Sequence, residues 1–251
     1  MYALDPSDVE SRRTNDSVDN ETRHSLKKDN LAEATASSVN WLGEHRPAVV
    51  RWVVAAVVVV VLVVAGAVIC DLRTSAANKA LGAALDLYNT PLAEPGAPLV
   101  DGQYNAAAAR AKEANRQFVA IAGDYSFTSA ATKAHYFAGV TYGELGQTAS
   151  AESELKEAAG SWNRNLANLA KLALANLYHQ TGRDSQAIEI FTALTAKPSE
   201  TVPAAMAQLS LADLYASAGR QSEAKALWAK IQDVDKEGAA GAIAAQKLAG
   251  K

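Results

Sequence analysis

The sequence has few residues for metal or thiol chemistry and no excess of basic charge. Its 251 residues include one cysteine, Cys70, so the chain closes no internal disulfide and builds no zinc site from cysteines, and with only four histidines a multi-histidine metal site is nearly excluded. The formal net charge of −3, from 24 Lys and Arg against 27 Asp and Glu, argues against nucleic-acid binding. Aromatic residues are sparse, whereas alanine, the best helix former, makes up about a fifth of the chain. We therefore expect an all-α protein.

The sequence also lacks the motifs of common catalytic sites. It has no glycine-rich phosphate loop, no H-E-x-x-H and no G-x-S-x-G. Glu152, Glu154 and Glu157 flank Lys156 and are expected to form a solvated helix face. His179 stands alone, and we expect it in a groove or on the surface. The prediction is a protein that is not an enzyme, with no catalytic, cofactor-binding or metal-binding residues, no cofactor and no small-molecule substrate.

One long hydrophobic run interrupts this mixed composition. Residues 49–69 would span roughly 31 Å as a helix at ~1.5 Å per residue, which matches a bilayer core. The run is too long for a strand, since strands have roughly 3–10 residues. About 48 residues precede it, unlike the start of a signal peptide, and Ile69 before Cys70 departs from a lipobox. We predict a transmembrane helix at 49–69.

The region before this run differs in composition from both the run and the rest of the chain. Residues 1–25 are rich in Asp, Ser, Asn and Arg and are expected to form a disordered cytoplasmic tail. Residues 26–47 carry apolar residues near helical spacing and predict a juxtamembrane helix, either lying on the inner membrane face or serving as a linker. Basic residues in the tail and the length of the C-terminal part favour a cytoplasmic N-terminus.

Three segments of the C-terminal part repeat one pattern. Their tyrosines, Tyr142, Tyr178 and Tyr215, are 36 and 37 residues apart. Each tyrosine follows a small residue by three positions and precedes a glycine by four, and a small residue and a large apolar residue come later at equal spacing. These residues are, in the same order, Gly139, Ala175 and Ala212; Gly146, Gly182 and Gly219; Ala151, Ala187 and Ala224; Leu155, Phe191 and Trp228.

The pattern resembles the tetratricopeptide repeat, a helix–turn–helix unit of 34 residues. The small residues would let helix A and helix B approach closely, the glycines would end helix A in a left-handed conformation, and Thr148 and Asp184 would start helix B as N-caps. The tetratricopeptide repeat domain covers 72–251. It contains repeats at about 132–165, 168–202 and 205–235, a degenerate first repeat at 72–123 made of helices at 72–89 and 104–123, a loop at 197–203 and a capping helix at about 236–249.

The order of these segments, a tail, one span and a repeat array, resembles the YfgM-like family, the ancillary subunit of the SecYEG translocon. The resemblance covers roughly residues 26–250. It implies a single-pass inner-membrane protein with periplasmic repeats, which binds the translocon SecYEG and a PpiD-like periplasmic chaperone and assists trafficking or chaperoning of exported proteins. The alternative is an anchored assembly factor of outer-membrane or cell-division machinery.

The resemblance also implies a protein-binding groove, because helix A residues line the concave face of tetratricopeptide repeats. Mixed polar and apolar character suits an extended peptide or a partner's helix. In the alternative arrangement, the helix at 72–89 or the last helix closes the groove, and binding uses the convex side. The candidate groove residues are Lys133, Tyr136, Val140, Leu172, Asn176, His179, Gln180, Leu209 and Asp213.

Overall fold

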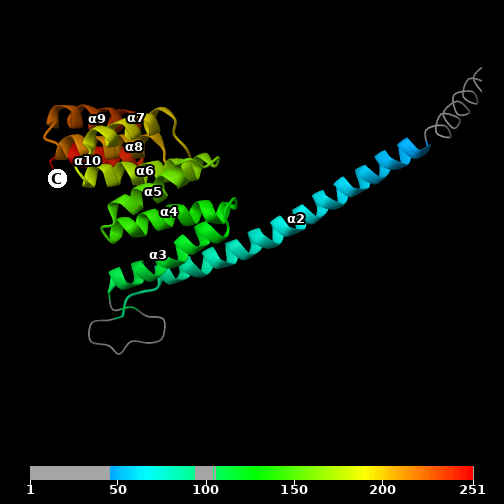
Figure 1. Ribbon diagram of the computed structural model, residues 1–251. Helices are drawn as coiled ribbons and strands as arrows, with labels where there is room; N and C mark the ends of the chain where they lie inside the picture. The colour runs from blue at the N-terminus through cyan, green and yellow to red at the C-terminus, as the bar shows by residue number, and fades with distance from the viewer. Residues whose placement is uncertain (1–45, 94–103, 105, 251) are drawn as a thin grey trace, which may run out of the picture. The chain divides into compact units, whose positions relative to one another are not determined.

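The computed structural model describes residues 46–93, 104 and 106–250, and within these ranges the chain is all-α. An isolated bridge between Leu92 and Tyr104 is the one β-type pairing in the same ranges. The predicted tail at 1–25 and most of the predicted helix at 26–47 lie outside them. The helices, shown in Figure 1, are α2 (Arg46–Asn89), α3 (Ala107–Asp124), α4 (Ser129–Glu144), α5 (Thr148–Ala159), α6 (Arg164–Gln180), α7 (Asp184–Ala196), α8 (Ala204–Ser217), α9 (Gln221–Val234) and α10 (Ala239–Leu248).

The chain divides into two compact units, Met1–Val68 and Ile69–Lys251. In the first unit the described residues belong to α2, which is long and apolar enough to cross a membrane. Its valine side chains are more than half exposed, for example 51% at Val58 and 65% at Val63. This surface has no partner among the described residues of the chain.

The sequence predicted separate helices at 49–69 and 72–89, whereas α2 runs without a break from Arg46 to Asn89. The physical reason is that residues 70–76 contain neither proline nor glycine, so nothing in the backbone ends the helix there. The second half of α2 belongs to the second unit, where Ala77, Leu81 and Ala84 are buried.

The second unit is a stack of consecutive helices, each packed against the next. One core cluster joins the second half of α2 with α3 and α4 around Phe118. A central cluster contains residues of α5, α6, α7 and α8 and is centred on Phe191. A third cluster joins α8, α9 and α10 around Trp228. Helices α4, α6 and α8 are the first helices of three successive pairs, and α4 contacts α6 while α8 contacts α10.

Small residues stand where the two helices of each pair meet. Ala175 and Ala212 are fully buried on α6 and α8, as are their counterparts Ala187 and Ala224 on the second helices. A Cβ added at Gly139 would lie 2.6 Å from Cγ of Leu155. The helices therefore approach more closely than larger side chains would allow.

The turn inside each pair has one recurring geometry. The glycines after α4, α6 and α8 have φ of +71°, +73° and +76°, which confirms the predicted left-handed helix ends. The residue after each glycine donates its backbone N–H to the carbonyl of the repeated tyrosine, at 2.9, 2.8 and 2.8 Å. Three turns of one kind explain why the three pairs repeat in shape.

The predicted N-caps at Thr148 and Asp184 are wrong. The capping positions are Gln147 and Arg183, neither of which caps through its side chain, and Thr148 and Asp184 are the first helical residues. The reason is that the turn ends one residue earlier than expected, since the residue after the glycine already belongs to the second helix's cap. Asp184 still complements the positive end of the α7 dipole.

The connection between α7 and α8 is fastened to α6. Helix α7 ends at Ala196, before Pro198, whereas Pro203 is the capping residue of α8 and not part of its first turn. Asn168 donates its side-chain N–H to the Lys197 carbonyl at 3.0 Å, and Val202 is fully buried. The residues of this connection are therefore an ordered part of the stack.

The close approach at Gly139 predicts opposite effects for two glycine substitutions on α4. Gly139→Ala places a methyl group 2.6 Å from Leu155 Cγ and 3.1 Å from the Ala151 carbonyl oxygen, and should lower the free energy of unfolding by about 1–3 kcal/mol. Gly143→Ala meets nothing within 4 Å and should raise it by up to about 1 kcal/mol. Thermal melts followed by circular dichroism measure both. Equal effects of the two substitutions would contradict the packing described.

Candidate protein-binding groove

The first helices of the pairs carry two adjoining hollows on one face of the second unit. The first hollow, about 320 Å³, lies between α4 and α6. Val140, Gly143 and Glu144 of α4 face Asn176 and Gln180 of α6 across it. Its lining is mixed, with apolar carbon from Val140 and polar groups from the amides and the carboxylate.

The second hollow, about 410 Å³, lies between α6, α8 and α10. Asn176 and His179 line it from α6, and Asp213 and Ser217 line it from α8. Lys247 of α10 stands at its far side, and its Nζ lies 3.0 Å from Oδ1 of Asp213. Asn176 lines both hollows, so they share a border and follow the face across successive helices.

The structure brings together five of the nine candidate groove residues. Val140, Asn176 and Gln180 line the first hollow, and Asn176, His179 and Asp213 line the second. The other four do not line either hollow. Lys133 is exposed on α4, Tyr136 and Leu172 are partly buried against the central cluster, and Leu209 is partly buried against the third.

His179 connects three helices at the rim of the second hollow. Its Nδ1 lies 2.7 Å from Oδ1 of Asp184 at the start of α7, and its Nε2 lies 3.2 Å from Oγ of Ser217 on α8. The imidazole is therefore held in one orientation, with one edge turned toward the hollow. Because both ring nitrogens are engaged within the chain, the imidazole offers a ligand in the groove the carbon edge and face of a fixed ring.

Seven lining residues of the second hollow were not among the candidate groove residues: Phe191, Ser210, Leu214, Ala216, Ser217, Trp228 and Lys247. Trp228 is 5% exposed, and its indole Nε1 has no hydrogen-bond partner among the described residues. The repeat pattern could have predicted Lys247. Helix α10 follows α9 in the position of the first helix of a fourth pair, and first helices line the groove. The last helix thus forms one wall of the second hollow.

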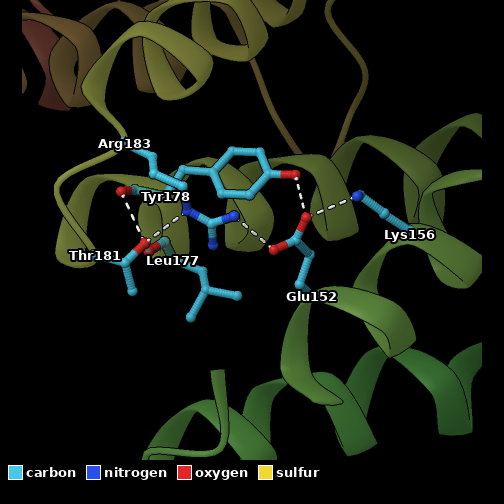
Figure 2. A network of polar contacts seen from close by, with 6 residues as sticks. All are labelled: Glu152, Lys156, Leu177, Tyr178, Thr181 and Arg183. Carbon is cyan, nitrogen blue, oxygen red and sulfur yellow. Dashed lines mark hydrogen bonds and ion pairs between the residues drawn. The ribbon is translucent and has the colours of Figure 1, made fainter. Parts of the chain in front are cut away.

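A polar network joins α5 to the end of α6 and to the turn that follows it (Figure 2). The Glu152 carboxylate accepts hydrogen bonds from Tyr178 at 2.9 Å, from Arg183 at 2.6 Å and from Lys156 at 2.7 Å. The Arg183 guanidinium lies over the Tyr178 ring, 4.3 Å from its centroid. These contacts bind the second helix of one pair to the first helix of the next.

The prediction of a solvated face at Glu152, Glu154 and Glu157 is wrong for two of the three. The side chains of Glu152 and Glu154 are 20% and 21% exposed, whereas Glu157 is exposed. Glu154 lies 2.6 Å from Nδ1 of His135 on α4, and this contact raises the pKa of His135. Apart from Lys156 on the same helix, the partners are 19 or more residues away in the chain, so local spacing does not reveal them.

Neighbouring charges and burial shift the pKa values of Glu152 and Tyr178 in this network. Lys156, then Arg183 and Tyr178, lower the pKa of Glu152 to about 2 by stabilising its charged form. Burial, and the hydrogen bond to Glu152, raise the pKa of Tyr178. The carboxylate is therefore ionised and the phenol neutral throughout the physiological range.

The stacking of arginine on the repeated tyrosine occurs twice. Arg220 lies over the Tyr215 ring at 4.2 Å, five residues after the tyrosine, as Arg183 does after Tyr178. In the first pair this position is Gln147. The spacing of five residues is a sequence signal for the contact, and it adds a cation–π interaction of about 0.5–1 kcal/mol at each site.

Comparison of the chain with models of protein families, with curated proteins and with solved structures found no match. The function is therefore argued from the residues and their geometry.

Glu152→Gln should lower the free energy of unfolding by roughly 1–2 kcal/mol at pH 7, because it weakens three hydrogen bonds to a charged group that keeps some solvent contact. The folded-state pKa is depressed, so this stability is present above the unfolded value of 4.5 and is lost as pH falls toward about 2. The variant should lose less stability than the wild type over that range. Thermal melts at several pH values measure it.

The matched control is Glu157→Gln, an exposed residue on the same helix. It should change the melting temperature little at any pH. If the two substitutions act equally, Glu152 does not carry the contact between the pairs.

Proposed function

We propose that the protein is a membrane-anchored scaffold whose repeat domain binds other proteins in the groove formed by the two hollows. In this proposal α2 spans the inner membrane through residues 49–69, and the second unit is a tetratricopeptide repeat solenoid in the periplasm. The role we propose is that of an ancillary translocon subunit, which assists trafficking or chaperoning of exported proteins.

The apolar surface of α2 supports the membrane span. Residues 53–69 form an unbroken apolar run, and their large side chains are half exposed or more in the described part of the chain. A continuous apolar surface of this length is not expected to stay exposed to water, because large exposed apolar patches mark contact with a membrane or a protein. A bilayer core is about as thick as the run is long.

The repeated helix pairs support the tetratricopeptide assignment. Each of the three pairs has a buried small residue three positions before the tyrosine and a left-handed glycine four positions after it. The second helix begins two residues after that glycine in every pair. This combination is the one expected for the helix–turn–helix unit of the tetratricopeptide repeat.

The single observation that carries the binding function is the pair of hollows that share Asn176. The Asn176 and Gln180 side chains are exposed there, and each offers both a hydrogen-bond donor and an acceptor to the backbone of an extended chain. Val140 and the ring of His179 provide apolar contact beside them. Alternating polar and apolar contacts along a groove suit an extended segment of a partner protein.

Site-specific photocrosslinking in native membranes tests the proposal. A photoreactive residue at Gln180, which is exposed in the first hollow, should capture components of the secretion or chaperone machinery. The matched control is Gln186 on α7, which is exposed on the second helix of the same pair and lies outside both hollows. Mass spectrometry identifies the captured proteins, and capture at Gln180 should exceed capture at Gln186 by about tenfold.

Three outcomes contradict parts of the proposal. Stronger capture at Gln186 places binding on the other face of the stack. Capture of only outer-membrane assembly or division proteins supports the alternative of an anchored assembly factor. Capture of only cytoplasmic proteins reverses the proposed orientation.

A further inference from the structure

Two aromatic side chains are fully exposed at equivalent places in the second unit. Phe127 and Trp162 have relative exposures of 108% and 105%. Each directly precedes a capping residue, since Thr128 caps α4 and Asn163 caps α6 through their side chains. Both therefore stand at the start of a first helix, one pair apart. A single exposed apolar side chain is common on protein surfaces, but two fully exposed aromatics at the same position of successive pairs are a repeated feature.

The backbone at Phe127 is also strained. Its φ of 69° lies in the left-handed region, and among the described residues no other non-glycine residue has a positive φ. A bulky side chain rarely adopts this conformation. The strain aims the ring outward, away from the core cluster around Phe118, so it is not explained by packing within the chain.

The turn that carries Phe127 is joined to the part of α2 that belongs to the second unit. Arg73 donates from Nη2 to the Asp124 carbonyl at 2.6 Å, three residues before Phe127. Arg73 is four helical residues after Ile69, or about 6 Å along the helix. The connection between α5 and α6, which carries Trp162, lies at the same edge of the stack, because consecutive helices run in opposite directions (Figure 1).

The later connections at this edge carry no exposed aromatic side chain, and Val234 at the end of α9 is their one large apolar side chain that is strongly exposed in the described part of the chain, at 80%. The one between α7 and α8 contains Ser199, Glu200 and Thr201, and the one between α9 and α10 contains Asp235 and Lys236. The exposed aromatics thus occupy the two connections nearest in the chain to the apolar run. This gradient is expected if the edge meets a membrane close to the anchor and leaves it further along the stack.

We propose that Phe127 and Trp162 insert into the headgroup region of the bilayer that α2 spans, and so hold the first pairs of the repeat domain against the membrane surface. Aromatic rings favour this interfacial layer, and exposed Arg73 and Arg164 at the same edge suit its phosphate groups. Asp71 and Asp124 are also exposed there, which keeps the contact shallow. The inference rests on the proposed membrane span.

The test uses the full chain in liposomes of phosphatidylcholine and phosphatidylglycerol. Cys70, the one cysteine, is replaced by serine, and an environment-sensitive fluorophore is attached to a new cysteine at Ser129, which is exposed two residues after Phe127. Lipids brominated near the headgroup should quench this label at least about threefold more than a label at Ala149, which is exposed at the opposite edge. The double substitution Phe127→Ser and Trp162→Ser should abolish the difference.

A label at Val58, near the middle of the apolar run, is read with lipids brominated near the end of the acyl chain, and it separates the two possible failures. Quenching at Val58 together with equal, weak quenching at Ser129 and Ala149 overturns the aromatic contact and leaves the membrane span intact. Absence of quenching at Val58 overturns the span itself, and this inference with it. A label at Ser129 that becomes protected only at high protein density, without quenching by brominated lipid, assigns the aromatics to contact with a second copy and overturns the membrane contact.

Discussion

Close contact between helices at positions that carry no more than a methyl group is the constraint on which the second unit depends. Gly139, Ala175 and Ala212 on the first helices meet Ala151, Ala187 and Ala224 on the second helices, and these alanines are all fully buried. Because the backbones approach closely there, Leu155, Phe191 and Trp228 fill the space one turn away. The left-handed glycines then fix where each first helix ends, so the same geometry is built three times.

In this packing, different parts of the surface have different roles. One side of every first helix is buried in the stack, and the other side borders the hollows, where Asn176 and His179 are reachable by a partner. Contacts such as Glu152 with Arg183 keep neighbouring pairs in register and so preserve the spacing of groove residues. The connections near the apolar run carry the exposed aromatics. The proposed anchor, the proposed binding face and the proposed membrane edge thus use separate residues.

The sequence predicts the repeated parts of the fold well, because their spacing reflects constraints that act within one pair. The tyrosines, glycines and alanines locate three helix pairs and the turns inside them. The groove is predicted less well, since Tyr136, Leu172 and Leu209 lie on the expected helices but turn part of their surface to the core. Glu152 was misassigned because its partners Tyr178 and Arg183 come from the next pair, and contacts between pairs depend on how helices stack and not on spacing along one helix.

Tyr178 and His179 are neighbours on α6, and the first lies in the core whereas the second lies at the rim of the groove. Substituting each of them by alanine tests this register most directly. Tyr178 is 4% exposed, and Tyr178→Ala should lower the free energy of unfolding by ~3 kcal/mol or more. His179 is part-buried at the rim of the hollow, and His179→Ala should lower it by less than about 1 kcal/mol. The measurement is the unfolding free energy of both variants beside the wild type. A small effect at Tyr178, or equal effects at both positions, would contradict the register of the stack and with it the groove.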